Sequence, residues 1–314
     1  FRELTYPQTR EVLKEARSHR IPVGVHAEDG EMVRKLEARL RADGADSPLD
    51  YAASRPETAE FAAVAALVEL CRSTGAHVHI VHLASGKALD FVAESRSQGV
   101  DISAETCPQY LHFTRDDLGR LGSLLKTAPV VKSAADRDRL WQGVIDGDIE
   151  FVTTDHAAGQ WPEEKRTGSI WSDYGGVPGV ELLLPYLYSE GVCAGRITLQ
   201  RLTEITAAAP ARFFGVDHRK GRLEPGCDAD FVVFDEEESW TVRAENLHNL
   251  NRYTPFEGET LTGRVRAVYV RGHCVFRRAT DGSEMFAPAG TGRWVRRGEP
   301  TGLESDSVRA GGTS

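Results

Sequence analysis

Residues 77–97 read HVHIVHLASGKALDFVAESRS, and this stretch sets the fold class. Its first part, from His77 to Leu83, is apolar and β-branched enough to predict a strand. From Gly86 to about Ser97 a helix is predicted. A strand that runs at once into a helix is one βα unit, and such units build sheets of parallel strands.

The same unit recurs on both sides of this stretch. A (β/α) barrel and a doubly wound sheet both consist of such repeats, and the pattern alone leaves the two open. The other predicted strands cover residues 21–25, 101–105 and 149–154. The other predicted helices cover residues 7–20, 136–145 and 179–188, together with one that Pro56 opens and that includes Cys71.

The pattern changes near Thr198. Helices are predicted to Ala209 and then to Gly215, and short strands follow at 221–223, 230–235 and 265–270, with glycine-rich turns between them. After Pro288 few apolar residues remain, which predicts a mobile tail. The predicted domains are therefore a βα portion at 1–215, a β-rich domain at 216–287 and a tail at 288–314.

Composition excludes several classes of protein. The 314 residues are 40% hydrophobic and carry a net charge of −9, so the surface repels phosphate and argues against nucleic acid as a partner. No run of 18 apolar residues predicts a membrane helix. Five scattered cysteines form no Cys-x-x-Cys pair, which favours the cytoplasm. The chain opens at Phe1 almost directly on a helix, so we expect it to begin inside a larger protein.

Chemistry-bearing residues follow three of the predicted strands: His26, His82 and Asp155. Barrel enzymes place their active sites at this edge, with each residue supplied by a different strand. Two imidazoles and a carboxylate are suitable ligands for a divalent metal such as zinc. The alternative is that each is merely a polar residue at the start of a loop.

Other candidates near these strand ends receive structural interpretations. Side chains alternate along a strand, so His77 and His79 are predicted to face away from His82, toward covering helices. By the same rule His156 faces away from Asp155. Cys107 precedes a proline and has no histidine partner that the sequence can establish, which favours a structural role.

A series of short strings, in order and in spacing, resembles the cyclic amidohydrolases: dihydropyrimidinase (hydantoinase), allantoinase and dihydroorotase. The resemblance covers about residues 5–280. The matching strings are VHAED (25–29), SRP (54–56), HIVHLAS (79–85), ETCPQYL (105–111), TTDH (153–156), GVPGVE (176–181), PARFFG (210–215) and GCDADFVVFD (226–235).

The resemblance implies the C-terminal part of a metal-dependent (β/α)8 TIM barrel, followed by a small β-rich, sandwich-like domain. It implies a hydrolase with two divalent metals, zinc first and manganese, cobalt or iron as alternatives. His26 and His82 would bind one metal and Asp155 the other. Asp155 would also carry the proton from the attacking hydroxide to the leaving ring nitrogen.

The resemblance also implies a substrate and an assembly. The substrate is a small cyclic amide of the hydantoin or dihydropyrimidine, allantoin or dihydroorotate type. Backbone at Ala128, Gly175 and Gly176 would hold it, with alanine standing at 128 where the family has serine or asparagine. Homodimers and homotetramers both suit the family.

Two features of the family are missing ahead of His26. These are a His-x-His on the first strand and a carbamylated lysine that bridges the metals, and both are expected upstream of Phe1. We therefore expect this chain alone not to assemble the full two-metal centre. The alternatives are an inactive fragment and a non-catalytic dihydropyrimidinase-like interaction protein, although such proteins tend to lose the metal ligands that this chain keeps.

Overall fold

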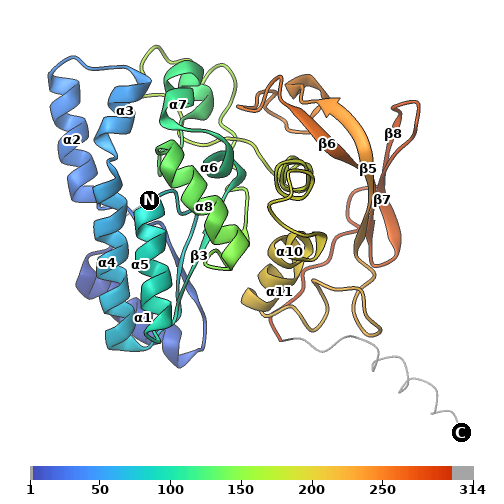
Figure 1. Cartoon of the computed structure of the whole chain (residues 1–314), viewed down its shortest axis with the longest axis horizontal. Helices are drawn as coiled ribbons and strands as arrows, with labels where there is room; N and C mark the ends of the chain where they lie inside the picture. Colours follow the sequence, from blue (N-terminus) through green and yellow to red (C-terminus); the bar gives the residue numbers. More distant parts are fainter. Residues whose placement is uncertain (1–2, 299–314) are drawn as a thin grey trace, which may run out of the picture. The chain divides into compact units, whose positions relative to one another are not determined.

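The structure, a computed structural model, describes residues 3–298 (Figure 1). The chain divides into two compact units. The first runs to Leu184 and includes Thr241–Glu259, and the second combines Pro185–Trp240 with the chain from Thr260 onward. Each unit is described by itself below.

A four-stranded parallel sheet forms the centre of the first unit. The strands lie side by side in the order β1-β2-β3-β4, so spatial order follows chain order. All residues of β2, β3 and β4 are buried, as expected of parallel strands covered by helices. The strands are β1 (Val23–Val25), β2 (Val78–Ile80), β3 (Ile102–Thr106) and β4 (Phe151–Val152).

Helices occupy every connection between these strands. The longest is α4 (Glu57–Thr74), which packs against α1 (Tyr6–Ser18) and α5 (Gly86–Ser97). In Figure 1, α4, α5 and α8 (Ala134–Asp146) stand side by side in front of β3. The remaining helices of the unit are α2 (Gly30–Ala42), α3 (Pro48–Ser54), α6 (Pro108–His112), α7 (Arg115–Leu121) and two 3₁₀ turns, Gly122–Leu125 and Ala244–Asn246.

Serine caps fix where the helices after the strands begin. The Ser85 side chain accepts the Ala88 N–H at 3.0 Å, so α5 starts directly after the loop that follows β2. Ser133 and Asp136 form a reciprocal capping box at the start of α8. The first of these caps holds the loop at the carboxyl end of β2 in a fixed position.

The second unit contains short helices followed by an antiparallel sheet. The sheet order is β5-β6-β7-β8, with β6 antiparallel to β7 and β7 to β8. The helices are α9 (Leu183–Leu187), which begins at the unit boundary, α10 (Leu199–Thr203) and α11 (Ala209–Phe213), with π-helical turns at Tyr188–Cys193 and Glu204–Ala208. The strands are β5 (Phe231–Thr241), β6 (Thr260–Val270), β7 (His273–Arg278) and β8 (Glu284–Phe286).

The predicted α/β class, with parallel strands first and a β-rich portion after them, is confirmed. The strand expected at 221–223 is wrong: the backbone there bends and has no regular secondary structure. Gly221 has φ = 87°, and a Cβ on it would lie 2.6 Å from the Ala211 side chain. Only glycine fits this close approach, which the sequence pattern does not reveal.

The domain boundaries at 215 and 287 stay predictions, because a compact unit need not coincide with a family domain. Of the tail expected at 288–314, residues 299–314 lie outside the described part of the chain. Within residues 3–298, no helix combines the length and the apolar character that crossing a lipid bilayer requires.

Candidate active site

The two strand ends that carry His82 and Asp155 share an unusual backbone conformation. Both residues have φ = 43°, in the left-handed region that residues other than glycine rarely enter. β2 has ended at Ile80 and β4 at Val152, so both residues lie beyond regular strand. The alternation of side chains along a strand therefore does not decide which way either residue points.

His26 and His82 lie against each other. Nδ1 of His26 is 3.2 Å from Nε2 of His82, and their ring centroids are 4.9 Å apart. His82 is buried, and this burial, together with the neighbouring His26, lowers its pKa to about 4. The structure thus brings together the two residues predicted to share one metal.

The second ring nitrogen of His26 contacts a buried carboxylate. Nε2 lies 2.9 Å from Oε2 of Glu28, whose side chain is 3% exposed and also pairs with Arg55. Burial raises the pKa of Glu28, but the His26 hydrogen bond and the Arg55 charge outweigh it, so the net shift is downward. Because a carboxylate only accepts hydrogen bonds, a neutral His26 carries its proton on Nε2 and presents the Nδ1 lone pair to His82.

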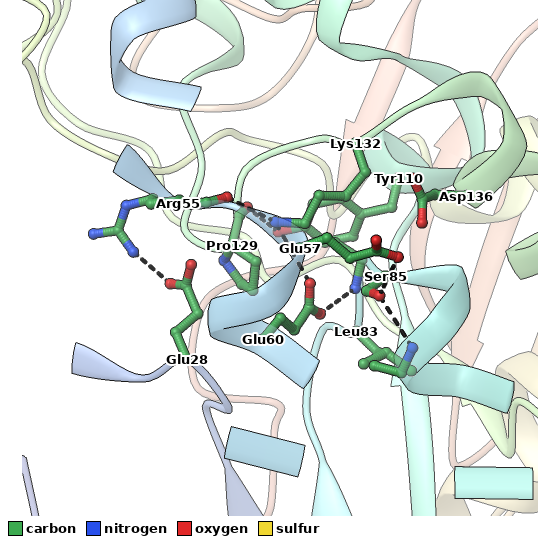
Figure 2. Close-up of polar contacts among 12 residues, drawn as sticks. Glu28, Arg55, Glu57, Glu60, Leu83, Ser85, Tyr110, Pro129, Lys132 and Asp136 are labelled. Carbon is green, nitrogen blue, oxygen red and sulfur yellow. Dashed lines mark hydrogen bonds and ion pairs between the residues drawn. The ribbon is translucent and has the colours of Figure 1, made fainter. Parts of the chain in front are cut away.

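Further buried charges connect this carboxylate to the loop that holds His82 (Figure 2). Nζ of Lys132 donates to the backbone oxygen of Arg55 at 3.2 Å and lies 3.6 Å from Oε2 of Glu60. Oε1 of Glu60 accepts the backbone N–H of Ala84 at 2.8 Å, two residues beyond His82. Glu60 is fully buried, which raises its pKa.

A second buried polar cluster joins β2, β3 and the end of β4. The two ring nitrogens of His79 lie 2.7 Å from Oγ of Ser103 and 3.3 Å from Oε2 of Glu105. The ring stacks on Phe151, and Thr153 donates to the other oxygen of Glu105 at 2.8 Å. With a partner at each nitrogen, the His79 ring is held by residues of β3 and β4, whereas the sequence predicted that it faces the covering helices.

Asp155 follows β4, and its side chain reaches solvent. Its pKa is nevertheless raised, first because nearby protein removes part of its hydration and second because Glu105 repels its negative charge. His26 acts in the opposite direction and lowers it. Asp155 is therefore electrostatically coupled both to the cluster around Glu105 and to the His26 imidazole.

His156 holds the next segment of chain in place. Backbone N–H groups of Gly179 and Val180 both donate to its Nδ1 at 3.2 Å. His156 also pairs with Val177 in an isolated parallel bridge. The ring therefore fixes residues 177–180 beside Asp155.

The two segments predicted to hold a substrate lie together. The Gly176 N–H donates to the backbone oxygen of Lys126 at 2.8 Å, two residues before Ala128. Gly176 has φ = 149°, and a Cβ there would lie 2.4 Å from a backbone oxygen, so only glycine is accommodated. Gly175 is exposed, and a Cβ on it would have no atom within 4 Å.

Two buried tyrosines fix the backbone around Ala128. The carbonyls on either side of this residue accept hydrogen bonds from Tyr51 at 2.9 Å and from Tyr110 at 2.8 Å. Burial raises the pKa of Tyr51 to about 12 and that of Tyr110 well above its ordinary value, so both hydroxyls stay protonated as donors. The roles of Ala128, Gly175 and Gly176 toward a substrate stay predictions.

Two lysines are buried close to the same backbone. Lys126 donates to the Asp173 carbonyl at 2.5 Å, and Lys165 donates to the Ser123 carbonyl at 2.7 Å. Burial lowers the pKa of Lys126 to about 8. Burial, with the charge of Lys126 added, lowers the pKa of Lys165 to about 7. Both ammonium groups thus tie chain segments together at the expense of desolvation.

The paired histidines fit a divalent metal. Two nitrogens bound to one tetrahedral zinc at about 2.0–2.1 Å lie about 3.3 Å from each other. The 3.2 Å between His26 Nδ1 and His82 Nε2 agrees with that separation. Within residues 3–298, no three His, Cys, Asp or Glu side chains converge as a complete ligand set. The described residues therefore supply an imidazole pair and not a closed metal site.

Sequence reasoning missed the charged residues behind the histidines. One of them left a signal: Glu60 stands on the buried face of α4, four residues before Val64 and in line with Cys71. A carboxylate on an apolar helix face needs a buried partner. Nothing in the sequence pointed to Lys132 as that partner.

The chain was compared with protein families and with curated proteins. Residues 2–275 match the amidohydrolase family. An allantoinase from Deinococcus radiodurans is 35% identical over 266 residues, which cover 85% of this chain and 58% of that enzyme. An L-hydantoinase from Paenarthrobacter aurescens is 33% identical over 275 residues, covering 87% of this chain and 59% of that enzyme. The chain thus spans less than two thirds of the length of these relatives.

Solved structures give the same result. An L-hydantoinase (dihydropyrimidinase) from Arthrobacter aurescens matches with a TM-score of 0.84 and 32% identity, over 88% of this chain and 61% of that one. A D-hydantoinase (dihydropyrimidinase) from a Thermus species matches with a TM-score of 0.89 and 29% identity, over 95% of this chain and 65% of that one. This likeness confirms the barrel type of fold over the doubly wound alternative.

Proposed function

Since this chain belongs to the amidohydrolase family, we propose that the protein carrying it hydrolyses a C–N bond in a small cyclic amide. The observation that carries the proposal is the contact between His26 and His82, whose facing nitrogens are 3.2 Å apart. Asp155 follows β4 of the same sheet. Allantoinases and hydantoinases among the relatives support the same reaction class.

Members of this family generally use divalent metals, and we propose two zinc ions here, with manganese, cobalt and iron as alternatives. His26 and His82 would hold one ion and Asp155 the other, and the remaining ligands, including a carbamylated lysine, would come from residues upstream of this chain. When bound, such ions lower the pKa of water and polarise a carbonyl group.

Asp155 is the proposed catalytic residue. Its carboxylate would accept the proton of the attacking water and deliver it to the ring nitrogen as the C–N bond breaks. Its side chain reaches solvent, as a group that contacts substrate must. One carboxylate can serve both steps because the proton it takes up in the first step is the one it donates in the second.

The backbone around Ala128 and Gly175–Gly176 would bind the ring. Cyclic amides carry adjacent C=O and N–H groups, and a peptide backbone offers the complementary pair. Tyr51 and Tyr110 hold the first segment, and the Gly176 hydrogen bond to Lys126 holds the second. We propose hydantoin, dihydropyrimidine, allantoin or dihydroorotate rings as the substrate class.

The cellular setting belongs to the same proposal. All five cysteines are free, which fits a reducing cytoplasm. Homodimers or homotetramers remain the proposed assembly, with neither nucleic acid nor membrane as a partner. A non-catalytic interaction protein is not favoured, because the matched relatives are named as enzymes.

The test is Asp155→Asn in the full-length protein, assayed with hydantoin, dihydrouracil, allantoin and dihydroorotate. We expect the unsubstituted protein to open at least one ring, and turnover to fall by about 10²–10⁴-fold in the variant with its circular dichroism unchanged. Asp146→Asn, at the exposed end of α8, is the control and should keep full turnover. Near-normal turnover in Asp155→Asn would exclude the proposed role.

A further inference from the structure

A continuous series of polar contacts, buried from Glu28 onward, joins the loop after β1 to the loop after β2. It runs from the His26 imidazole through Glu28 and Arg55, and then through Lys132 and Glu60 to the backbone next to His82. Figure 2 shows the central members of this series, from Glu28 on one side to Glu60 on the other. The two histidines that contact each other directly are thus also connected behind the site.

The first half of the series determines how His26 is oriented. Glu28 accepts from Nε2 at 2.9 Å, and its own position is set by the Arg55 guanidinium. Arg55 follows α3 and lies over the Tyr51 ring at 5.3 Å, which limits its movement. With Nε2 bound in this way, the ring can face His82 only through Nδ1.

The second half determines where the His82 loop lies. Glu60 projects from α4 and accepts the Ala84 N–H at 2.8 Å. Lys132 lies beside Glu60 at 3.6 Å and reaches back to the Arg55 carbonyl at 3.2 Å. Arg55 therefore belongs to both halves, through its guanidinium on one side and its carbonyl on the other.

The free-energy cost of burying these charged side chains indicates that they do more than fill space. The side chains of Glu28, Glu60 and Lys132 are 3%, 1% and 6% exposed. Removing charges from water costs several kcal/mol per ion before pairing, and well-packed apolar residues often stabilise a fold as well or better. The chain instead keeps two carboxylates, Glu28 and Glu60, and two cations, Arg55 and Lys132. Glu28 contacts His26, and Glu60 contacts the loop of His82.

We propose that Glu28 is a positioning residue for His26: held by Arg55, it keeps the proton on Nε2 and aims Nδ1 at the point that a metal shared with His82 would occupy. Lys132 and Glu60 extend the same support to the His82 loop. The inference rests on the proposed function only in taking that shared point as a metal position. A carboxylate that binds the far nitrogen of a histidine ligand fixes its tautomer and raises its affinity for the ion.

The first test needs no metal. Long-range ¹H–¹⁵N spectra of the metal-free full-length protein report which imidazole nitrogen carries the proton. We expect neutral His26 to be the Nε2–H tautomer, and Glu28→Gln to convert it to a mixture, because an amide can both donate and accept. Glu57→Gln is the matched control: it lies on α4 and binds Ser85 at 3.1 Å but contacts neither histidine. His26 as the Nδ1–H tautomer, or unchanged in Glu28→Gln, would overturn the proposal.

The second test measures zinc affinity of the full-length protein by competition with a chelator. Glu28→Gln should weaken binding by about 10–100-fold, the range for groups that hydrogen-bond to a metal-ligating histidine. Arg55→Lys, which keeps the charge but loses the two-pronged guanidinium, should weaken it less, and Glu57→Gln should not weaken it. Equal affinity in Glu28→Gln and the unsubstituted protein would refute the positioning role.

These outcomes separate this inference from the proposed function. If the unsubstituted full-length protein binds no zinc or opens no ring, the proposed function fails, while the tautomer of His26 still tests Glu28. If Glu28→Gln does not fold, Arg55→Lys carries the affinity comparison. If zinc binds and the tautomer does not respond to Glu28, the positioning role alone is wrong.

Discussion

The two compact units differ in what they bury. In the first, charged and polar side chains lie deep inside, among them Glu60, Lys132, Lys165 and His79. In the second, buried charge is sparser among the described residues: the Arg278 side chain is 8% exposed and pairs with Glu284. Burying a charge costs free energy. The concentration of buried charges in the first unit therefore indicates that they position neighbouring groups and do not chiefly stabilise the fold.

The antiparallel sheet of the second unit is held by other contacts. Phe231 stacks on Tyr269 with ring centroids 4.5 Å apart, and Arg264 pairs with Glu238 at 2.7 Å while both remain about one fifth exposed. Aromatic contacts of this kind contribute about 0.5–1.5 kcal/mol each, and ion pairs near the surface about 0–1 kcal/mol. Each of these two contacts therefore contributes little by itself.

The largest expected difference comes from removing one ion-paired side chain in each unit. Lys132→Met leaves the Glu60 carboxylate buried without its cation and should lower the free energy of unfolding by about 3–5 kcal/mol. Glu238→Gln removes the partly exposed partner of both Arg264 and Arg266 and should cost less, at most about 1 kcal/mol for each pair. Urea unfolding measures both, and similar losses would contradict the contrast between the units.

A double variant sharpens this first comparison. Lys132→Met with Glu60→Gln removes both charges and should recover part of the stability lost by Lys132→Met alone. The buried pair is not the cause of the loss if adding Glu60→Gln to Lys132→Met lowers the free energy of unfolding as much as Glu60→Gln does alone.

The second prediction concerns the pH dependence of stability in the first unit. The pKa of Lys165 is lowered by burial to about 7 in the folded chain, so the unfolded chain binds this proton more tightly. Between about pH 7 and the ordinary lysine pKa, Lys165 therefore makes the fold more stable as pH rises, by at most about 1.4 kcal/mol per pH unit.

Lys165→Met isolates this effect. The free energy of unfolding of the unsubstituted protein minus that of the variant should increase from pH 7 to pH 9 in urea titrations. The lost hydrogen bond to the Ser123 carbonyl is absent at every pH and cancels from the slope. A difference that stays flat or falls over this interval would show that Lys165 is not held in a desolvated position.

The smallest expected effect concerns His156, which fixes residues 177–180. His156→Ala removes the acceptor of two backbone N–H groups and should cost about 1 kcal/mol locally. His156→Asn places an oxygen near the former Nδ1 and should keep most of that energy. Amide exchange at Gly179 and Val180 should accelerate about fivefold in the alanine variant and little in the asparagine variant. Equal rates in both variants would show that the His156 Nδ1 does not hold this segment.

Local patterns were enough to predict much of the first unit. The helix at 86–97 begins and ends where the sequence places it, and the strand at 101–105 differs from β3 by one residue at each end. Both elements combine a clear apolar period with a serine, glycine or proline at an end. The helix expected at 198–209 is instead interrupted by a π-helical turn, because its apolar pattern does not encode which carbonyl each N–H reaches.

The candidate site was partly predictable for a similar reason. His26 and His82 were found because strand ends converge at one edge of a parallel sheet, a rule that needs no knowledge of side chains. Arg55 and Lys132 were not, because their contacts join segments 27 and 77 residues apart. Partners at such separations depend on tertiary packing, which local sequence periodicity does not predict.

The left-handed backbone at His82 and Asp155 has a consequence for evolution and design. For residues with a Cβ, this conformation costs about 1–2 kcal/mol because the Cβ lies too close to backbone oxygen, and glycine avoids that clash. Selection for thermal stability alone should therefore favour glycine at both positions. If the proposed function holds, histidine and aspartate at these positions reduce stability in return for chemistry, and we expect substitutions to glycine there to stabilise the fold and lower turnover.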